Sequence, residues 1–208
     1  IKVIEDNAHG LFGQYKGKNL GSIGDLSAHS FHETKNFSCG EGGALFVKNK
    51  DFIQRSEMIL EKGTNRSRFL NGQVDKYSWV DKGSSYCLSD ILAALLYSQL
   101  LSNKKIQKHR KYLWENYYNE LQEWTKKNEV QLPFVPDHCK QTHHMFYMIL
   151  PNESIRDSFI NYMYSNNITT AFHYLPLNSS KMGLEIALEG QQDCPVSSMM
   201  SDQIVRLP

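Results

Sequence analysis

The sequence predicts an α/β protein in which strands and helices alternate along the chain. Short apolar runs at 1–5, 26–31 and 43–47 have the length and the flanking polar residues or glycines of buried strands. Longer segments with helical character follow them, at 51–63, 88–101 and 104–128. This alternation is typical of layered α/β proteins rather than of all-β sandwiches.

The first half of the chain supplies three strands and two helices. The first strand ends in Glu5-Asp6, and the next two cover 26–31 and 43–47. The following helix starts near Asp51 and is closed by Gly63, a residue type that favours the left-handed C-cap conformation. The segment LSDILAALLYSQLL has an N-cap residue in Ser89 and is apolar nearly all round, so we expect a buried helix.

The second half begins with a long helix over 104–128. Its apolar residues recur at helical spacing: Ile106, Leu113, Tyr117, Leu121 and Trp124. A strand at 143–151, a helix at 154–167 and a strand at 168–177 follow it and predict a second, smaller domain. We therefore divide the chain into domains at 1–105 and 106–208.

Composition excludes several classes of function. The chain has 23 Lys and Arg against 22 Asp and Glu, a net charge of +1, so neither a nucleic-acid surface nor another polyanion site is expected. Four scattered cysteines without a CxxC pair predict reduced thiols and a cytoplasmic protein rather than a zinc site or a disulfide framework. No apolar run has membrane-spanning length, and no signal peptide is visible. The chain starts inside a strand-like run and stops at VRLP, so we expect it to be truncated at both ends.

The stretch SFHETKNFSCGEGG places Lys35 among hydroxyls and glycines after a strand. A P-loop would need lysine after its glycines, and a dinucleotide fingerprint would need glycine where Leu45 stands. His29 and His32 beside Glu33 do not form the HExxH pattern, and a strand would not align a pair three residues apart. We therefore expect no metal site here.

A lysine that acts as a nucleophile fits this stretch better. Pyridoxal phosphate (PLP) needs a lysine, a carboxylate at its pyridine nitrogen and hydroxyl or amide donors for its phosphate. Asp6 stands at the end of the first strand, where α/β sheets bind ligands. Ser30 could serve the phosphate.

Six segments resemble one family in the same order: EDNAH, SFHETKNFSCGEGG, KGTNRSRF, GSSYCLSDILAALL, HHMFY and FHYLPL. They are similar to the DegT/StrS-type sugar-nucleotide aminotransferases, PLP enzymes with the aspartate aminotransferase type I fold. The resemblance covers nearly all 208 residues. It implies an incomplete large domain at 1–105 and part of a small C-terminal domain at 106–208. Family segments outside these residues supply further phosphate donors and an aromatic that stacks on the cofactor ring.

The resemblance assigns roles to individual residues. Lys35 resembles the Schiff-base lysine, Asp6 the partner of the pyridine nitrogen, His9 a residue near the ring hydroxyl, and Ser30 a phosphate-binding serine. Each of the last three has a plain structural alternative: a helix N-cap for Asp6, a satisfied core histidine for His9, and a strand-end hydrogen bond for Ser30.

Other family positions are matched less closely. The family commonly has GxNxR where this chain has Gly83-Ser84-Ser85-Tyr86-Cys87, so Ser85 replaces the asparagine that binds cofactor phosphate and Cys87 the arginine. Serine still donates a hydrogen bond, whereas cysteine cannot replace arginine. The resemblance further implies a substrate-binding role for four residues: Asn65, Arg66, His173 and Tyr174.

The implied reaction moves an amino group from glutamate to a TDP-linked 4-keto-6-deoxyhexose. The product, a TDP-4-amino-4,6-dideoxy sugar, would serve surface polysaccharides of the O-antigen type. A homodimer with active sites at the subunit interface is expected. A C-3 aminotransferase of the same family, or a non-catalytic fragment that keeps the fold, stays open. The dehydratase branch has histidine in place of the lysine, so Lys35 argues against it.

Overall fold

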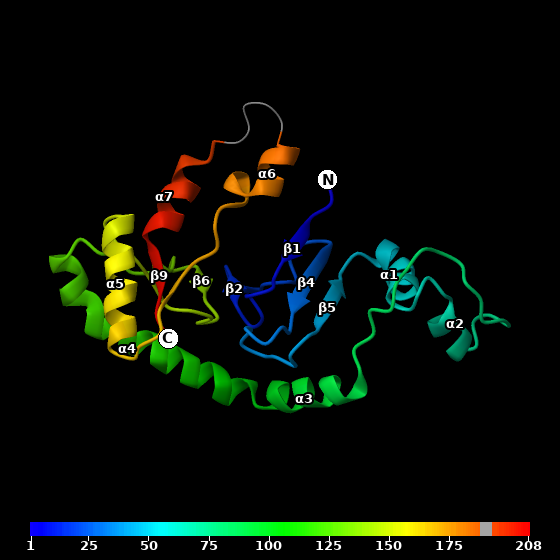
Figure 1. Cartoon of the computed structure of the whole chain (residues 1–208). Helices are drawn as coiled ribbons and strands as arrows, with labels where there is room; N and C mark the ends of the chain where they lie inside the picture. Colours follow the sequence, from blue (N-terminus) through cyan, green and yellow to red (C-terminus); the bar gives the residue numbers. More distant parts are fainter. Residues whose placement is uncertain (188–192) are drawn as a thin grey trace. The chain divides into compact units, whose positions relative to one another are not determined.

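The computed structural model describes residues 1–187 and 193–208 (Figure 1). They form two compact units, of which the first comprises Ile1–Lys108 and Val135–His144 and the second His109–Phe134 and Met145–Pro208. The division expected at residue 105 did not foresee that Val135–His144 returns to the first unit. That return brings a late part of the sequence to the candidate site.

The main sheet of the first unit has the order β1-β4-β5. Its strands are β1 (Ile4–Asp6), β4 (Leu26–Ser30) and β5 (Gly43–Val47), close to the predicted ranges, although β1 begins only at Ile4. β1 pairs in parallel with β4, and β4 pairs antiparallel with β5. Because β1 and β4 are parallel, Asp6 and Ser30 end their strands at the same edge of the sheet.

A second small sheet in the same unit joins β2 (Gln14–Tyr15), β3 (Lys18–Asn19) and β6 (Cys139–Lys140). Lys16 and Gly17 connect β2 to β3 with positive φ angles of 48° and 76°, as a two-residue type I′ hairpin requires. Strands of two residues carry no alternation pattern, so the sequence did not predict them. Pairing of β2 with β6 holds the segment that follows Lys140 beside the residues that follow β1.

The core of the first unit lies between the sheet and α3 (Asp90–Leu101). Phe31, Phe37, Cys39 and Leu96 are buried there. The predicted N-cap is confirmed, because Ser89 Oγ accepts the backbone N–H of Leu92 at 3.4 Å.

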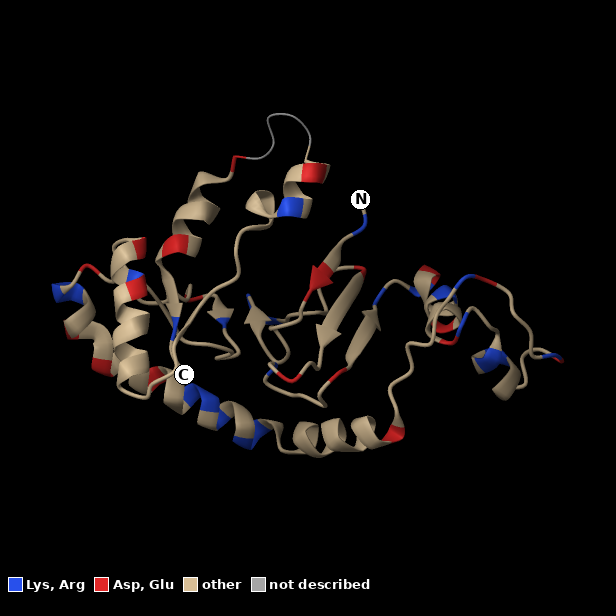
Figure 2. Cartoon of the chain, in the orientation of Figure 1, with Lys and Arg blue, Asp and Glu red and all other residues tan. Residues whose placement is uncertain are grey.

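The expectation that α3 is buried all round is wrong for this chain. Only Leu96 of the helix is buried, whereas Ile91, Tyr97 and Leu101 expose 83%, 64% and 69% of their surface. Figure 2 shows that α3 is uncharged after its first residue, Asp90. The chain by itself therefore covers only one side of an apolar helix.

After β5, a short 3₁₀ turn η1 (Lys50–Phe52) leads into α1 (Ile53–Leu60), and α2 (Arg66–Leu70) follows. Two left-handed residues follow α1: Lys62 with φ 62° and Gly63, the predicted one, with φ 74°. Gly63 occupies the next position and donates its N–H to the carbonyl of Met58 at 2.7 Å, which is the Schellman pattern. Gly63 also needs to be glycine because a Cβ there would meet the carbonyl of Asp81.

α4 (Asn103–Lys127) confirms the long helix expected at 104–128. The apolar stripe differs in detail: Tyr117 and Leu121 pack on the core of the second unit, but Leu113 and Trp124 are 45% and 39% exposed. Trp114 and Tyr118 pack there in their place. Near the start of α4, Ile106 packs on the core of the first unit instead.

The second unit contains a three-stranded sheet of order β7-β9-β8, with antiparallel pairs. Its core consists of Val130, Phe146, Met148, Leu150 and Val205. The strand–helix–strand unit was predicted, but its strands are shorter than expected, and η2, α6, α7 and the central β9 were missed. The elements are β7 (Tyr147–Ile149), α5 (Glu153–Ser165), β8 (Ala171–Phe172), η2 (Leu177–Ser179), α6 (Lys181–Ile186), α7 (Pro195–Gln203) and β9 (Ile204–Arg206).

Within the described part of the chain, no helix combines the length and the apolar character needed to cross a membrane.

Candidate functional site

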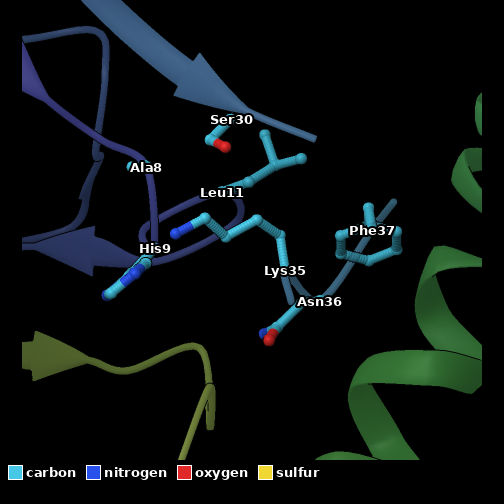
Figure 3. Close-up of a pocket in the computed structure, with 7 residues that line it drawn as sticks. All are labelled: Ala8, His9, Leu11, Ser30, Lys35, Asn36 and Phe37. Carbon is cyan, nitrogen blue, oxygen red and sulfur yellow. The ribbon is translucent and has the colours of Figure 1, made fainter. Parts of the chain in front are cut away.

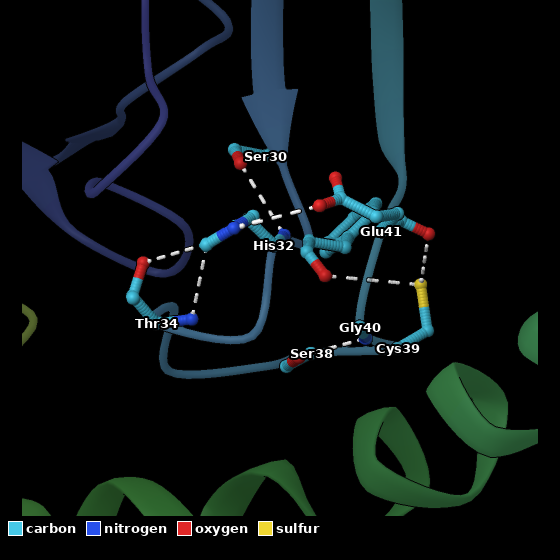
Figure 4. Close-up of polar contacts among 8 residues, drawn as sticks. Ser30, His32, Thr34, Ser38, Cys39, Gly40 and Glu41 are labelled. Carbon is cyan, nitrogen blue, oxygen red and sulfur yellow. Dashed lines mark hydrogen bonds and ion pairs between the residues drawn. The ribbon is translucent and has the colours of Figure 1, made fainter.

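Lys35 stands in a loop of residues 31–42, named here the lysine loop, which connects β4 to β5. Its two ends are closed by backbone hydrogen bonds from Phe31 N–H to the Gly42 carbonyl at 2.8 Å and from Cys39 N–H to the Phe31 carbonyl at 3.0 Å. The Cys39 thiol also lies 3.3 Å from the carbonyl oxygen of Glu41 (Figure 4). Burial, and then the Glu41 carboxylate, raise the pKa of this thiol, so Cys39 is a packing residue of the loop.

Packing against α3 holds one side of the lysine loop. Phe37 is only 1% exposed and lies in the core with Phe31 and Leu96. Gln99 of α3 accepts the N–H of Ser38 at 3.0 Å through Oε1 and donates to the Ser38 carbonyl through Nε2. Burial of an aromatic side chain such as Phe37 contributes about 1.5–3 kcal/mol. The loop that carries Lys35 is therefore well anchored.

The Lys35 side chain enters a small pocket with its amine directed toward the residues after β1 (Figure 3). The pocket holds about 10 Å³, room for about one water molecule. Within the described residues Lys35 forms no ion pair. The lining residues are Ala8, His9, Leu11, Ser30, Lys35, Asn36 and Phe37.

A second, larger cavity of about 450 Å³ adjoins the same loop after β1. Ala8 and His9 line both this cavity and the lysine pocket. Its volume falls within the range of small-molecule sites, roughly 300–1,000 Å³. The lining residues are Asp6, Asn7, Ala8, His9, Gly10, Leu20, Gln141 and Thr142. Four predicted site residues thus line two adjoining cavities: Asp6, His9, Ser30 and Lys35.

The structural alternatives for these residues can be judged from their surroundings. No helix follows Asp6, whose Oδ1 accepts the N–H of Ala8 at 3.1 Å in an Asx-turn arrangement, so it is not a helix N-cap. His9 is exposed and stacks on His144, so it is not a core histidine. Ser30 does make the strand-end hydrogen bond, to the N–H of His32 at 3.4 Å, and also lines the lysine pocket.

The carboxylate of Glu5, next to Asp6, is occupied by hydrogen bonds from the backbone. Its carboxylate accepts the N–H groups of Gly21 at 2.8 Å and of Ile23 and Gly24 at 2.6 Å. Burial alone would raise the pKa of Glu5, but these three donors, with Lys48, hold it below its ordinary value of 4.5. Glu5 therefore stays ionised and fixes the loop before β4.

A buried polar network lies directly behind the loop after β1. Asn7 Nδ2 lies 3.3 Å from Nδ1 of His29, and Ser27 Oγ lies 3.0 Å from its Nε2. Because an amide NH₂ can only donate, His29 accepts at Nδ1 and carries its proton on Nε2. Burial lowers the pKa of His29 below its ordinary 6.5, although the Glu5 carboxylate opposes this shift. His29 is thus uncharged, and its hydrogen bonds hold Asn7 in the loop after β1.

The histidines considered for a metal site have other partners. His29 belongs to the network described above, while His32 Nδ1 lies 3.0 Å from Thr34 Oγ1 and its Nε2 3.6 Å from Glu41 (Figure 4). In residues 1–187 and 193–208, no group of three or more His, Cys, Asp and Glu side chains could hold a metal ion.

Three predicted ligands of the first unit lie outside both cavities. Ser85 is exposed and forms a β-bridge with Glu61. Asn65 is buried; its amide donates to the Lys76 carbonyl at 3.0 Å and accepts the Ser78 N–H at 2.8 Å. Arg66 contacts both carboxylate oxygens of Glu61, at 3.1 and 3.2 Å. The structure gives each of these residues a local partner.

His173 and Tyr174 belong to the second unit and follow β8. Their rings meet edge to face at 5.3 Å, and the Arg206 guanidinium lies 6.0 Å from the Tyr174 ring. Burial, and then Arg206, lower the pKa of His173. Tyr174 is 78% exposed, whereas the Nδ1 atom of His173 is buried and finds no hydrogen-bond partner among the described residues. Neither residue lines one of the two cavities.

Sequence reasoning missed Asn36, Thr142 and His144. Asn36 donates to the Thr142 carbonyl at 2.8 Å, and its Oδ1 lies 2.8 Å from His144 Nδ1. The segment HHMFY was noted as part of a strand and as one of the six family-like segments, but no role was assigned to His144. No spacing rule links residues more than 100 positions apart, so the sequence alone could not find this contact.

Comparison with known proteins shows which family the chain resembles. The profile of the DegT/DnrJ/EryC1/StrS aminotransferase family matches residues 1–208. An uncharacterised protein of Methanocaldococcus jannaschii is 30% identical over 184 residues, 86% of this chain and 47% of the relative. A UDP-4-amino-4,6-dideoxy-N-acetyl-beta-L-altrosamine transaminase of Campylobacter jejuni is 29% identical over 150 residues, 72% of this chain and 38% of the relative.

Solved structures confirm the predicted fold class, the type I fold of PLP-dependent transferases. A putative sugar aminotransferase of Streptococcus pneumoniae, solved in a PLP form, matches 100% of this chain and 52% of its own with a TM-score of 0.82 and 21% identity. The same protein has been solved in a PMP form, with a TM-score of 0.84. The chain thus spans about half the length of the relatives it matches.

The buried His29 makes stability depend on pH. Its pKa is lowered in the folded state, whereas an unfolded histidine titrates near about 6.5. Below that pH the unfolded chain binds a proton that the folded chain does not, so we expect the free energy of unfolding to fall as pH drops through about 6.5. The loss levels off once the pH passes below the folded pKa. Glu5, the charged group that acts on His29, stays ionised over this range.

Urea unfolding of the full-length protein between pH 7 and pH 5 measures this dependence. His29→Gln should flatten the pH profile, and the matched change of the exposed His138, His138→Gln, should leave it unaltered. Part of the slope will persist in His29→Gln, because the pKa of His173 is lowered as well. Parallel profiles for wild type and His29→Gln would show that His29 does not carry this effect.

Proposed function

Because the chain belongs to the DegT/DnrJ/EryC1/StrS aminotransferase family, we propose that the whole protein transfers an amino group to a nucleotide-linked keto sugar, with PLP as cofactor. One observation carries the proposal. Asp6 and Ser30 end two parallel strands at one edge, and His9 and Lys35 line adjoining cavities there. A carboxylate, a hydroxyl, an imidazole and an amine without an ion pair thus come together at the ligand-binding edge of an α/β sheet.

The residues present fit PLP. Lys35 supplies an amine in a pocket with an apolar wall of Leu11 and Phe37. Asp6 would hold the pyridine nitrogen and His9 the ring hydroxyl, and both line the cavity of about 450 Å³. Ser30 would donate to the phosphate. When bound, PLP supplies an electron sink that stabilises negative charge on the carbon bearing the amino group.

The binding and proton-transfer roles would fall to residues of this chain. Lys35 would hold the cofactor, and its Nζ would accept the proton that leaves the α-carbon of the amino donor and pass it on. Asp6 would keep a proton on the pyridine nitrogen, since an ionised carboxylate stabilises an adjacent positive charge. The anchored lysine loop fixes the backbone that carries Nζ, which would favour repeated proton transfer.

For the substrate we propose a TDP-linked 4-keto-6-deoxyhexose, with glutamate as amino donor and a surface polysaccharide as the end use. The Campylobacter jejuni relative, named for a UDP-4-amino-4,6-dideoxy sugar, supports amination at C-4 of a deoxy sugar. Asn65, Arg66, His173 and Tyr174 stay candidate substrate contacts on the family resemblance. Ser85 stays a candidate phosphate ligand.

We also propose that the protein acts as a homodimer. The exposed apolar side of α3 supports this, because Ile91, Tyr97 and Leu101 together form an uncharged helix surface. Large exposed apolar surfaces mark interaction sites in soluble proteins. Sedimentation of the full-length protein at micromolar concentration measures its oligomeric state, and a monomer there would contradict the proposal.

The substrate proposal is tested with purified full-length protein, glutamate and a panel of keto sugars. TDP-4-keto-6-deoxyglucose should give the highest kcat/KM, ahead of its 3-keto isomer and of a UDP-linked 4-keto-6-deoxy-N-acetyl sugar. Preference for the 3-keto isomer would assign the protein to C-3 amination instead. Failure to bind PLP and to aminate any substrate would favour a non-catalytic protein that keeps the fold.

Lys35→Ala should lower turnover by about 1,000-fold or more, because no other described lysine lines either cavity. Borohydride reduction followed by peptide mass spectrometry should find the cofactor attached to Lys35 in the wild type and to no residue in the variant. Lys18→Ala, which changes an exposed lysine of β3, is the matched control and should behave as wild type. Near wild-type turnover in Lys35→Ala would end the assignment.

Asp6→Asn should lower kcat by about 100-fold or more while cofactor affinity changes much less. An amide cannot hold the pyridine nitrogen protonated, so the electron sink weakens although the site keeps its shape. Comparison of kcat with the dissociation constant for PLP separates the two effects. The exposed Asp75→Asn provides a control, and a kcat of Asp6→Asn close to the control's would reduce Asp6 to a turn residue.

A further inference from the structure

The segment Thr142–His144, named here the clasp, makes four contacts with the candidate site, although it lies over 100 residues later in the sequence. Thr142 Oγ1 donates to the His9 carbonyl at 2.7 Å, and Asn36 Nδ2 donates to the Thr142 carbonyl at 2.8 Å. His144 Nδ1 lies 2.8 Å from Asn36 Oδ1. The His144 ring stacks on the His9 ring with centroids 4.2 Å apart and planes 28° from parallel.

Through these contacts the clasp links two segments of the site to each other. The first is the loop after β1, which carries His9, and the second is the lysine loop, in which Asn36 directly follows Lys35. The clasp binds both, at the His9 backbone and ring and at the Asn36 amide. The position of His9 is thereby coupled to that of the residue next to the reactive lysine.

The backbone conformation of the clasp allows Thr142 and His144 to contact both segments. His143 has a positive φ of 51°, an unfavourable conformation for a residue with a side chain. Residues held in such conformations persist where the surrounding structure enforces them, and they cluster at functional sites. β2–β6 pairing fixes the chain just before the clasp, at Cys139 and Lys140.

Hydrogen-bond chemistry fixes the tautomer of His144. The Thr142 carbonyl only accepts, so the Asn36 NH₂ group points toward it and the Asn36 oxygen points toward His144. An oxygen acceptor requires a donor, so Nδ1 of His144 carries a proton.

We propose that His144 is a positioning residue of the site: held by Asn36 through Nδ1–H, it fixes the ring plane of His9 and couples it to the backbone beside Lys35. This inference rests on the proposed function, because it takes His9 and Lys35 to face the same cofactor. His144 itself lines neither cavity and acts through the two residues that it contacts. Misplacement of reacting groups by about 1 Å costs up to about 100-fold in rate.

Two substitutions at His144 separate its two contacts. His144→Asn places an amide donor near the position of Nδ1, which keeps the hydrogen bond to Asn36 but loses the ring. His144→Phe keeps a ring to stack on His9 but loses the donor. Thr142→Val removes the third link, the hydrogen bond to the His9 carbonyl, with little change in shape. His138→Phe is the matched control, because His138 packs its ring on Tyr15 at 5.2 Å and lines neither cavity.

The first measurement needs no cofactor. In the full-length protein, NMR of histidine ring nitrogens should assign the Nδ1–H tautomer to His144 and should show that the His9 resonance shifts in both His144 variants. The control should leave the His9 resonance unchanged. Unfolding midpoints close to wild type in His144→Asn and His144→Phe would confirm that the shifts reflect local position rather than loss of the fold.

The second measurement is kinetic. Both His144 variants should lower kcat by about 10- to 100-fold, with the KM of the amino donor within about twofold of wild type. An unchanged His9 resonance together with a kcat within about twofold of wild type would overturn the proposal. Failure of the wild type to bind PLP would instead overturn the proposed function, whereas the NMR result in cofactor-free protein would still decide whether His144 positions His9.

Discussion

The parallel pairing of β1 with β4 is the constraint on which the site depends. Parallel strands end at one edge, so the last residues of β1 and β4 project their following loops into the same space. The loop after β1 carries His9, and the loop after β4 carries Lys35. An antiparallel pair would have placed these two loops at opposite edges. The placement of Lys35 next to His9 therefore depends on backbone hydrogen bonds that involve neither residue.

Much of the fold could be predicted from local patterns. The strands at 26–31 and 43–47, the N-cap at Ser89 and the long helix after residue 103 follow from apolar spacing and capping chemistry, and the structure has them within a residue or two. The misses share a physical cause. β2, β3 and β6 have two residues each and are stabilised by their partners, while β9 is central in its sheet only because β7 and β8 flank it. Such strands exist through tertiary pairing, which a local pattern does not encode.

The residues of the site likewise fall into those that sequence patterns could identify and those that they could not. Lys35, Asp6, His9 and Ser30 lie within 30 residues of one another, and strand ends mark two of them, so sequence reasoning could select them. Asn36, Thr142 and His144 form hydrogen bonds across 106 and 108 positions. Asn36 and His144 lie in family-like segments, but no sequence pattern showed that these segments meet. Asn65 shows the complementary case, because the family motif singled it out as a substrate contact, and its buried amide also hydrogen-bonds the backbone of Lys76 and Ser78. A motif identifies a residue type at a position, and only the surrounding packing decides what its polar atoms are free to bind.

Glu5 and Asp6 illustrate this point most directly, because they are neighbours with the same functional group. Successive side chains of a strand point to opposite faces, so the two carboxylates face different surroundings. Glu5 accepts three backbone N–H groups and is committed to the loop before β4. Asp6 accepts one, from Ala8, and lines the large cavity. A carboxylate saturated by backbone donors has little capacity left for a ligand, whereas one with an open oxygen at a strand end retains it. The roles of the two acids thus follow from strand alternation and from where the next loop turns, and a swap of Glu and Asp in the sequence would not exchange them.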